Sequence, residues 1–145
     1  MIVNRSMPPG VIIPELAYRD VLAASAWLCR ALGFRERLRI GDHRVQLLYG
    51  QTSLVVTELQ GDPKKADVAH AMLVHVADVD QHHAHALAAG ARIMQPPTDF
   101  PYGERQYLLE DIGGHRWKFS QSIADVDPAS WGGTLVTATP ELEQP

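Results

Sequence analysis

The same order of structural signals occurs twice along this chain of 145 residues. The first copy runs from Ile13 to Asp20 and continues as a helical stretch that stops at Gly33. The second runs from Ala71 to Asp78 and continues as a helical stretch that stops at Gly90. A repeat of about fifty residues constrains the fold strongly, because each unit has to bury its apolar face against a neighbouring unit.

The first copy predicts a βαβββ unit, a strand followed by a helix and three further strands, at residues 11–59. Asp20 is suited to cap the helix, because its carboxylate accepts the free amide hydrogens of the first turn. Apolar residues between Leu22 and Leu32 recur at three- and four-residue spacing, which predicts one buried stripe before Gly33 ends the helix. The later strands are expected at Arg35–Ile40, Val45–Tyr49 and Ser53–Leu59.

The second copy predicts a matching unit at residues 70–121, after a linker at residues 60–69. Asp78 or Asp80 caps its helix, and Gly90 ends it. Its later strands are expected at Arg92–Met94, Arg105–Leu109 and Arg116–Gln121, with a long proline-bearing loop at Gln95–Glu104. The tail at residues 122–145 predicts a short helix after Asp127-Pro128 and disorder over about the last ten residues.

Charge and hydropathy exclude several classes of partner. The formal net charge is −4, which gives no reason to expect binding to nucleic acid or to an anionic membrane. No apolar run reaches the roughly 18 residues that a membrane-spanning helix needs, and the first residues lack the apolar centre of a signal peptide. The sequence therefore predicts a cytoplasmic protein without nucleic-acid or membrane partners.

Two such units joined head to tail resemble the vicinal oxygen chelate superfamily, which includes glyoxalase I, extradiol dioxygenases, fosfomycin-resistance enzymes and bleomycin-resistance proteins. The most specific match is Tyr102–Tyr107 followed by Glu110–Trp117. This segment is similar to the superfamily's Asp-Pro-x-Gly turn before the last strand, with Ile112 in place of the proline. The resemblance covers residues 11–121. It implies one α+β domain over residues 1–145, in which two tandem βαβββ modules form a curved mixed-sheet cup with helices on the outer face.

The resemblance also implies four metal-ligand positions, which carry His, Gln or Glu in metal-dependent members. Counting from the capping aspartates and the late turn places three of them at Ile13, Ala71 and Lys118, and aligning the two modules by their apolar positions places the fourth at Val55. These side chains are not ordinary ligands of a divalent ion, so we expect no metal and no cofactor. A shift of one residue in a strand would reverse its faces. Displaced ligands such as His70 and Glu58 therefore remain an alternative.

Alternation along the strands predicts the side chains that face the cup. They give a largely apolar cavity with sparse polar groups, which is typical of a small-molecule site. Trp117 is expected to point away from the cup, toward the helices. No catalytic residue is assigned. The candidate ligand-binding residues are Glu15, Ser53, Thr57, Leu73, His75, Lys118 and Ser120 on the strands, with Tyr102 and Arg105 from the loop at the rim.

Some of these residues have a structural alternative. Glu15 and Lys118 would neutralise each other as an ion pair, and His75 would be a hydrogen-bonded histidine without a catalytic role. The histidine-rich run Gln81–His85 is interpreted as the solvated face of a helix, because it lacks a third metal ligand of fixed geometry.

Three functional hypotheses follow. The first is a metal-free small-molecule-binding protein of the bleomycin-resistance type, which sequesters an antibiotic or a metabolite. The second is a metal-dependent lyase, isomerase, thiol transferase or dioxygenase with displaced ligands, among them Glu15, Glu58, His70 and His75. The third is a metal-free enzyme with His75 or Glu15 as base and Lys118 stabilising negative charge. By analogy with relatives, and because two-fold pairing is the commonest assembly, a homodimer is expected.

Overall fold

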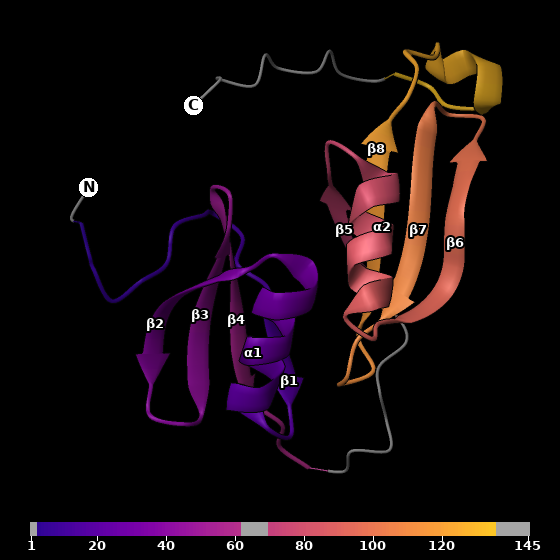
Figure 1. Cartoon of the computed structure of the whole chain (residues 1–145). Coiled ribbons are helices and arrows are strands. Elements are labelled where there is room, and N and C mark those ends of the chain that lie inside the picture. The colour runs from indigo at the N-terminus through magenta and orange to yellow at the C-terminus, as the bar shows by residue number, and fades with distance from the viewer. Residues whose placement is uncertain (1–2, 62–69, 136–145) are drawn as a thin grey trace.

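The computed structural model describes residues 3–61 and 70–135 (Figure 1). Most of the expected linker, at residues 62–69, and the expected disorder at the end of the tail lie outside the described residues. Within them, the chain forms two four-stranded sheets and two α-helices, which confirms the α+β class and the two βαβββ modules.

The two modules have the same topology. In each sheet the module's first strand pairs in parallel with its last strand, which gives the orders β1-β4-β3-β2 and β5-β8-β7-β6. Module one consists of β1 (Glu15–Tyr18), α1 (Val21–Leu32), β2 (Arg35–Ile40), β3 (Arg44–Tyr49) and β4 (Thr52–Glu58). Module two consists of β5 (Met72–His75), α2 (Val79–Ala88), β6 (Arg92–Phe100), β7 (Glu104–Glu110) and β8 (Arg116–Ser122), and a 3-10 turn at Pro128–Trp131 follows.

The expected helix ends are confirmed. The Asp20 carboxylate accepts the Ala23 amide at 3.0 Å, and the Asp78 carboxylate accepts the Gln81 amide at 3.0 Å, so Asp78 rather than Asp80 caps α2. Gly33 ends α1 with φ of 83°, the left-handed conformation that glycine adopts without strain.

The proline-bearing loop expected at Gln95–Glu104 is wrong. Most of this segment belongs to β6, which pairs with β7 and contains two register shifts, one between Ile93 and Gln95 and one between Gln95 and Thr98. Strand β6 is an edge strand, so the prolines at 96 and 97 lie at a bulge where a missing amide hydrogen breaks no essential ladder bond.

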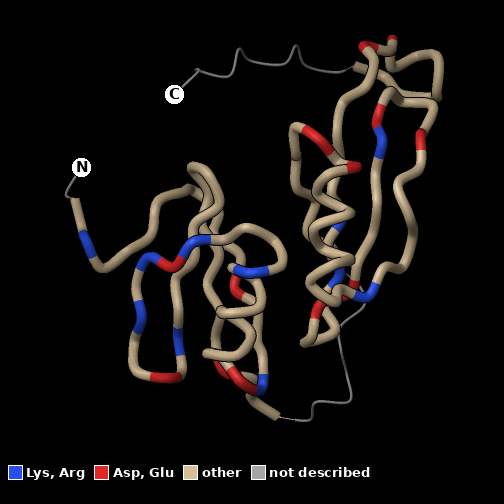
Figure 2. The backbone as a smooth tube through the Cα atoms, in the orientation of Figure 1, with Lys and Arg blue, Asp and Glu red and all other residues tan. Residues whose placement is uncertain are grey.

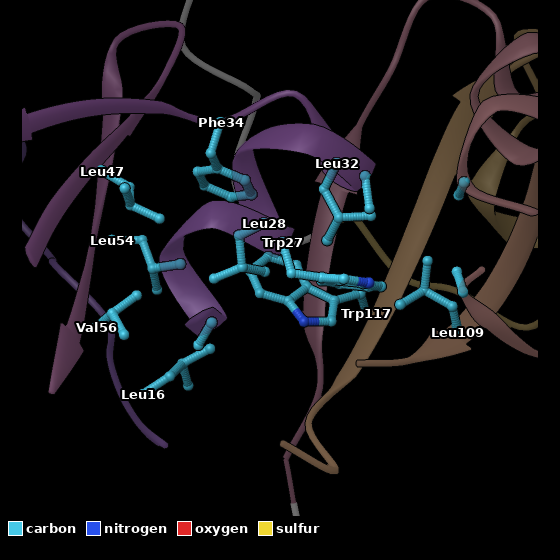
Figure 3. Close-up of a cluster of buried hydrophobic side chains, with 14 of the residues drawn as sticks. Leu16, Trp27, Leu28, Leu32, Phe34, Leu47, Leu54, Val56, Leu109 and Trp117 are labelled. Atoms are coloured by element: carbon cyan, nitrogen blue, oxygen red, sulfur yellow. The ribbon is translucent and has the colours of Figure 1, made fainter. Parts of the chain in front are cut away.

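One hydrophobic core joins the two modules. Figure 3 shows α1 between Leu47, Leu54 and Val56 of the first sheet and Leu109 and Trp117 of the second. The core therefore lies on the helix-bearing side of both sheets.

Two aromatic rings make this junction. Trp117 is 1% exposed, as expected for a side chain directed toward the helices, and its ring centroid lies 5.5 Å from that of Phe34. Contacts of this kind bind the modules to each other through the side of each sheet that carries its helix.

Asp111 forms a second junction between the modules. This residue is 5% exposed, and its carboxylate accepts hydrogen bonds from the Tyr18 hydroxyl of module one at 2.5 Å and from the Trp117 indole at 2.9 Å. The same carboxylate accepts the amides of Gly113 and His115. Burial, followed by the charge of Asp111, raises the pKa of Tyr18 far above its ordinary value, so this phenol remains a donor.

Acidic and basic residues are interspersed over both modules (Figure 2).

The side of each sheet opposite its helix is here called its open face. The two open faces lie on the far sides of the shared core, so they do not face each other within one chain. The first open face includes Glu15, Ala17, Gln46, Ser53, Val55 and Thr57, and the second includes Leu73, His75, Glu104, Gln106, Lys118 and Ser120.

Candidate functional site

A cavity of about 460 Å³ lies between the modules, beside the edge strand β5. Its walls are mainly apolar, because the end of α1, the β3–β4 hairpin and β5 all present core-type residues there. The aromatic residues among them come from β3, from β8 and from the link between α1 and β2, so the cavity depends on tertiary packing. The lining consists of Ile12, Pro14, Phe34, Tyr49, Thr52, Ser53, Leu54, Met72, Leu73, Val74, His75 and Trp117.

The two aliphatic hydroxyl groups in this lining are already hydrogen-bonded. The Thr52 hydroxyl donates to the Tyr49 carbonyl at 2.7 Å, and the Ser53 hydroxyl donates to the Pro9 carbonyl at 2.5 Å. His75 is different, since its side chain is 76% exposed and its Nδ1 lies 4.0 Å from Glu104 Oε1. The cavity thus combines apolar walls with one accessible imidazole at its edge, and it can hold an organic molecule by shape and by a small number of polar contacts.

The candidate residues divide into three groups. Ser53, Leu73 and His75 line the cavity. Thr57 lies on the first open face, opposite Ala17 and Arg44, and Lys118 lies on the second, opposite Leu73 and Leu108. Ser120 and Tyr102 belong to a hydrogen-bonded network on the second open face.

Two candidate residues are engaged elsewhere. Glu15 pairs with Arg44 at 2.5 Å, so the ion pair between Glu15 and Lys118 is wrong: the two residues lie on different sheets. Arg105 is directed to the helix side of its sheet, where it bonds Asp99 at 2.6 Å and Asp80 at 2.9 Å. Its hydrogen bond lowers the pKa of the Asp99 carboxyl.

The network on the second open face includes two residues that sequence reasoning missed. Glu104 accepts a hydrogen bond from Ser120, and Gln106 joins Ser120 to Tyr102. Both lie on β7, at positions that alternate with buried Tyr107 and Leu109. Had the alternation rule been applied to β7 as well as to the first and last strands of the module, it would have placed them on this face.

A segment before β1 covers part of the first open face. The Arg37 guanidinium donates to the Arg5 carbonyl at 2.9 Å, and the Gln46 amide donates to the Ser6 carbonyl at 2.9 Å. Together with the bond from Ser53 to Pro9, these contacts hold residues 5–9 against the sheet. Cover on the second open face is uneven, because Leu73 is 59% exposed whereas Gln106 and Ser120 are 7% and 1% exposed.

At the four implied metal positions, the side chains present do not fit a metal ion. The positions that the superfamily resemblance assigns to ligands carry Ile13, Val55, Ala71 and Lys118, none of which is an ordinary ligand. Over residues 3–61 and 70–135, no three His, Cys, Asp or Glu side chains come together as a metal-binding group.

The displaced ligands considered above do not assemble either. Glu15 bonds Arg44. His70 lies beside His115, with ring centroids 5.6 Å apart, and His115 Nε2 is 2.8 Å from the Ala17 carbonyl oxygen.

The interpretation of Gln81–His85 as a solvated face is only partly right. His85 is exposed, but the His82 ring lies 4.0 Å from that of Phe119, and its Nδ1 is 2.5 Å from the Tyr107 hydroxyl. The His83 ring packs edge-on against Tyr107 at 5.2 Å. Helix α2 is short and only weakly amphipathic, so the face that its polar residues present was decided by packing on β7 and β8.

Because His82 is packed in this way, the folded protein is expected to lose stability in mild acid. Burial, and then the neighbouring His85, lower the pKa of His82 below its ordinary 6.5. As the pH falls below that value, the unfolded chain takes up the proton more readily than the folded one, so unfolding is favoured. The urea midpoint should therefore fall between about pH 7.5 and about pH 5.5.

The matched variants are His82→Gln, which should flatten this decrease, and His43→Gln in an exposed turn, which should leave it unchanged. A decrease of equal size in all three proteins would show that His82 does not cause it.

Two tandem βαβββ modules around a shared core, with an apolar cavity beside β5, define a class of two-module α+β proteins. The chain belongs to the Glyoxalase/Bleomycin resistance protein/Dioxygenase superfamily, whose sequence pattern matches residues 11–119. This agrees with the resemblance found in the sequence.

Among solved structures, TioX from Micromonospora sp. ML1 is 36% identical to this chain, with a TM-score of 0.65 over 81% of this chain and 100% of that one. TnmS3, an antibiotic binding protein from Streptomyces sp. CB03234, is 23% identical, with a TM-score of 0.65 over 78% of this chain and 95% of that one. At that identity, the likeness to TnmS3 shows the fold alone.

A curated relative, an uncharacterized protein of Mycobacterium bovis, is 30% identical over an alignment of 96 residues, and the match covers 62% of this chain. The match spans only 59% of that relative's own length. None of the helices in the described part of the chain is long and apolar enough to cross a membrane.

Proposed function

We propose that this protein binds a small organic molecule, an antibiotic or a metabolite, without the help of a metal ion. It sequesters this molecule and does not convert it. The observation that carries the proposal is the cavity of about 460 Å³ beside β5, with Phe34, Tyr49 and Trp117 in its walls. Small-molecule sites commonly have volumes of about 300–1,000 Å³ and are lined mainly by apolar and aromatic groups. The antibiotic-binding role named for TnmS3, which shares this fold, supports the same proposal.

The chemistry of the lining favours binding over catalysis. The hydroxyls of Thr52 and Ser53 already donate to backbone carbonyls. Among the described residues, the carboxylate oxygen nearest to His75 is that of Glu104, at 4.0 Å, which is too far for the hydrogen bond that would orient a base. Among the described residues that line the cavity, no nucleophile is therefore paired with an oriented base.

The test compares two leucines of similar exposure. Leu73 lines the cavity and is 59% exposed, whereas Leu87 on α2 is 54% exposed and lies outside it. We expect a panel of aromatic antibiotics to contain a compound that binds one-to-one and is recovered unchanged. Leu73→Arg should weaken its affinity about tenfold or more, which corresponds to about 1.4 kcal/mol, and Leu87→Arg should not.

Equilibrium dialysis measures the affinity, and chromatography of the recovered compound shows whether it has been altered. Steady consumption of the compound would contradict sequestration and would indicate that the protein is an enzyme. A loss of affinity of the same size in both arginine variants would contradict the assignment of the cavity as the binding site.

The same proposal includes a homodimer. Strands β1 and β5 each pair with one neighbour, and the two open faces lie on the far sides of the core. A second copy would enclose these faces, which one chain leaves apart, and two-fold pairing is the commonest way in which identical chains do this. Light scattering is expected to give the mass of two chains, and a mass of one chain would contradict the pairing.

A further inference from the structure

A one-way chain of hydrogen bonds crosses the second open face. The Tyr102 hydroxyl donates to Gln106 Oε1 at 2.9 Å, and the Gln106 amide nitrogen donates to the Ser120 hydroxyl oxygen at 3.0 Å. The Ser120 hydroxyl in turn donates to Glu104 Oε1 at 2.7 Å. Ser120 is 1% exposed and Gln106 is 7% exposed, so packing holds the middle of this chain in place.

The direction of these bonds determines what the site can accept. A hydroxyl has a single hydrogen to donate, and Tyr102 and Ser120 both use theirs within the chain. The chain of hydrogen bonds ends at the Glu104 carboxylate, which in its ionised form is only an acceptor. The group that completes the site at Glu104 therefore has to be a hydrogen-bond donor.

The charge of Glu104 indicates which kind of hydrogen-bond donor the site would bind. Its side chain is only 17% exposed, and the nearest basic side chain among the described residues is the imidazole of His75, whose Nδ1 lies 4.0 Å from Glu104 Oε1. Other carboxylates of the molecule have closer partners: Glu110 pairs with Arg92, and Glu15 pairs with Arg44. A carboxylate that is largely removed from water is stabilised by a partner of opposite charge, and the described residues supply none within hydrogen-bonding distance of Glu104.

The surroundings of Glu104 are suited to an aromatic molecule. The Tyr102 ring stacks on Phe100 with centroids 5.4 Å apart, and Trp131 lies 5.5 Å from Tyr102 and is 47% exposed. His75 connects the two regions, since it lines the cavity and faces Glu104. A molecule seated in the cavity thus lies beside His75, which is next to Glu104, and the chain of hydrogen bonds leads from Glu104 to the Tyr102 ring.

We propose that Glu104 binds the protonated amine of an aromatic ligand, with Ser120 and Gln106 holding the carboxylate in position and Leu73 and His75 lying beside it. The inference rests on the proposed small-molecule function and names the chemical class of the ligand. It follows from the one-way hydrogen bonds, from a carboxylate that no cation of the described residues approaches within hydrogen-bonding distance, and from the rings beside Tyr102. An aromatic ammonium ion satisfies all three, because it combines a cationic donor with an apolar ring.

Three indole compounds of similar size test the proposal. Tryptamine carries an ammonium group, tryptophol carries a neutral hydroxyl in its place, and indole-3-propionate carries a negative charge. NMR titration of the wild-type protein is expected to give affinities in that order, with tryptamine binding about tenfold more tightly than tryptophol. This order is measured on the wild-type protein alone and so does not depend on any variant folding.

Two substitutions on β7 locate the effect. Glu104→Gln keeps an oxygen that accepts from Ser120 but removes the charge, so tryptamine and tryptophol should then bind equally. Glu110→Gln on the same strand removes a carboxylate that Arg92 already neutralises, so the preference for tryptamine should persist. A preference that survives Glu104→Gln, or that is lost in Glu110→Gln, overturns the assignment.

The outcomes separate this inference from the proposed function. Equal binding of tryptamine and tryptophol to the wild type overturns the amine site while leaving small-molecule binding intact. Binding of none of the three indoles, together with an antibiotic that binds in a Leu73-dependent way, also overturns the amine site alone. Failure of every indole and of the whole antibiotic panel overturns both.

Discussion

The Asp111→Ala protein is expected to unfold with a free energy about 3–5 kcal/mol below that of the wild type. The substitution leaves the Tyr18 hydroxyl and the Trp117 indole without their shared acceptor, and both groups are buried. A buried donor without a partner costs about 1–3 kcal/mol, and here two are left at one place. Because Tyr18 belongs to module one and Trp117 to module two, the loss also weakens the junction between the modules. Urea denaturation followed by circular dichroism measures the effect.

The matched control for Asp111 is Asp127→Ala. Asp127 is an exposed cap, whose carboxylate accepts only the Ala129 amide among the described contacts, at 3.1 Å. Its removal should cost about 1 kcal/mol or less. Tyr18→Phe should fall between the two, since it removes one donor but keeps the ring. Equal losses in the two aspartate variants would show that the buried junction contributes nothing beyond an ordinary cap.

Gly103→Ala is expected to cost about 2–4 kcal/mol, through both backbone strain and overlap. Gly103 has φ of 85°, and a Cβ there would lie 2.4 Å from the Ala124 carbonyl oxygen and 3.0 Å from Val126 Cγ2. The Gly103 carbonyl also accepts the Ile123 amide at 2.8 Å, so the turn between β6 and β7 holds the segment that leads to Trp131. Thermal unfolding and Trp fluorescence should report a lower midpoint and a changed environment of Trp131.

Gly90→Ala separates the two causes. Gly90 has nearly the same backbone conformation, with φ of 88°, but a Cβ there would meet nothing within 4 Å. Its substitution should therefore cost only the strain of the left-handed conformation, about 1 kcal/mol. If both glycine variants lose the same stability, the close approach of residues 124–126 has no energetic consequence.

Local signals predicted most of the secondary structure. The capping aspartates Asp20 and Asp78 and the stop at Gly33 act through groups within a few residues of themselves, so their effect is visible in the sequence. The prolines at 96 and 97 predicted a loop that does not form, because a local signal carries no information about the position of a strand in its sheet. A proline marks a loop locally, but at a bulge in an edge strand it is compatible with pairing, and only the position of β6 in the sheet shows this.

The candidate site was only partly predictable. Alternation correctly separated Trp117, which is in the core, from Lys118 and Ser120 on the open face. Alternation does not predict which residues far apart in the chain will pair, and Glu15 forms an ion pair with Arg44 instead of Lys118. The bonds that hold residues 5–9 against the first sheet leave no periodic pattern, because they use backbone carbonyls as acceptors.

By itself, the sequence determined the two βαβββ modules, their helix ends and the side of each strand that faces the core. These properties depend on periods of about two and 3.6 residues and on caps within one turn. Only the tertiary structure decided that the modules share a core through their helix-bearing sides, that a cavity lies beside β5, and that Glu104 ends a one-way chain of hydrogen bonds. Each of these depends on contacts between residues far apart in the chain, and such contacts are selected by packing and charge in three dimensions, which no local pattern contains.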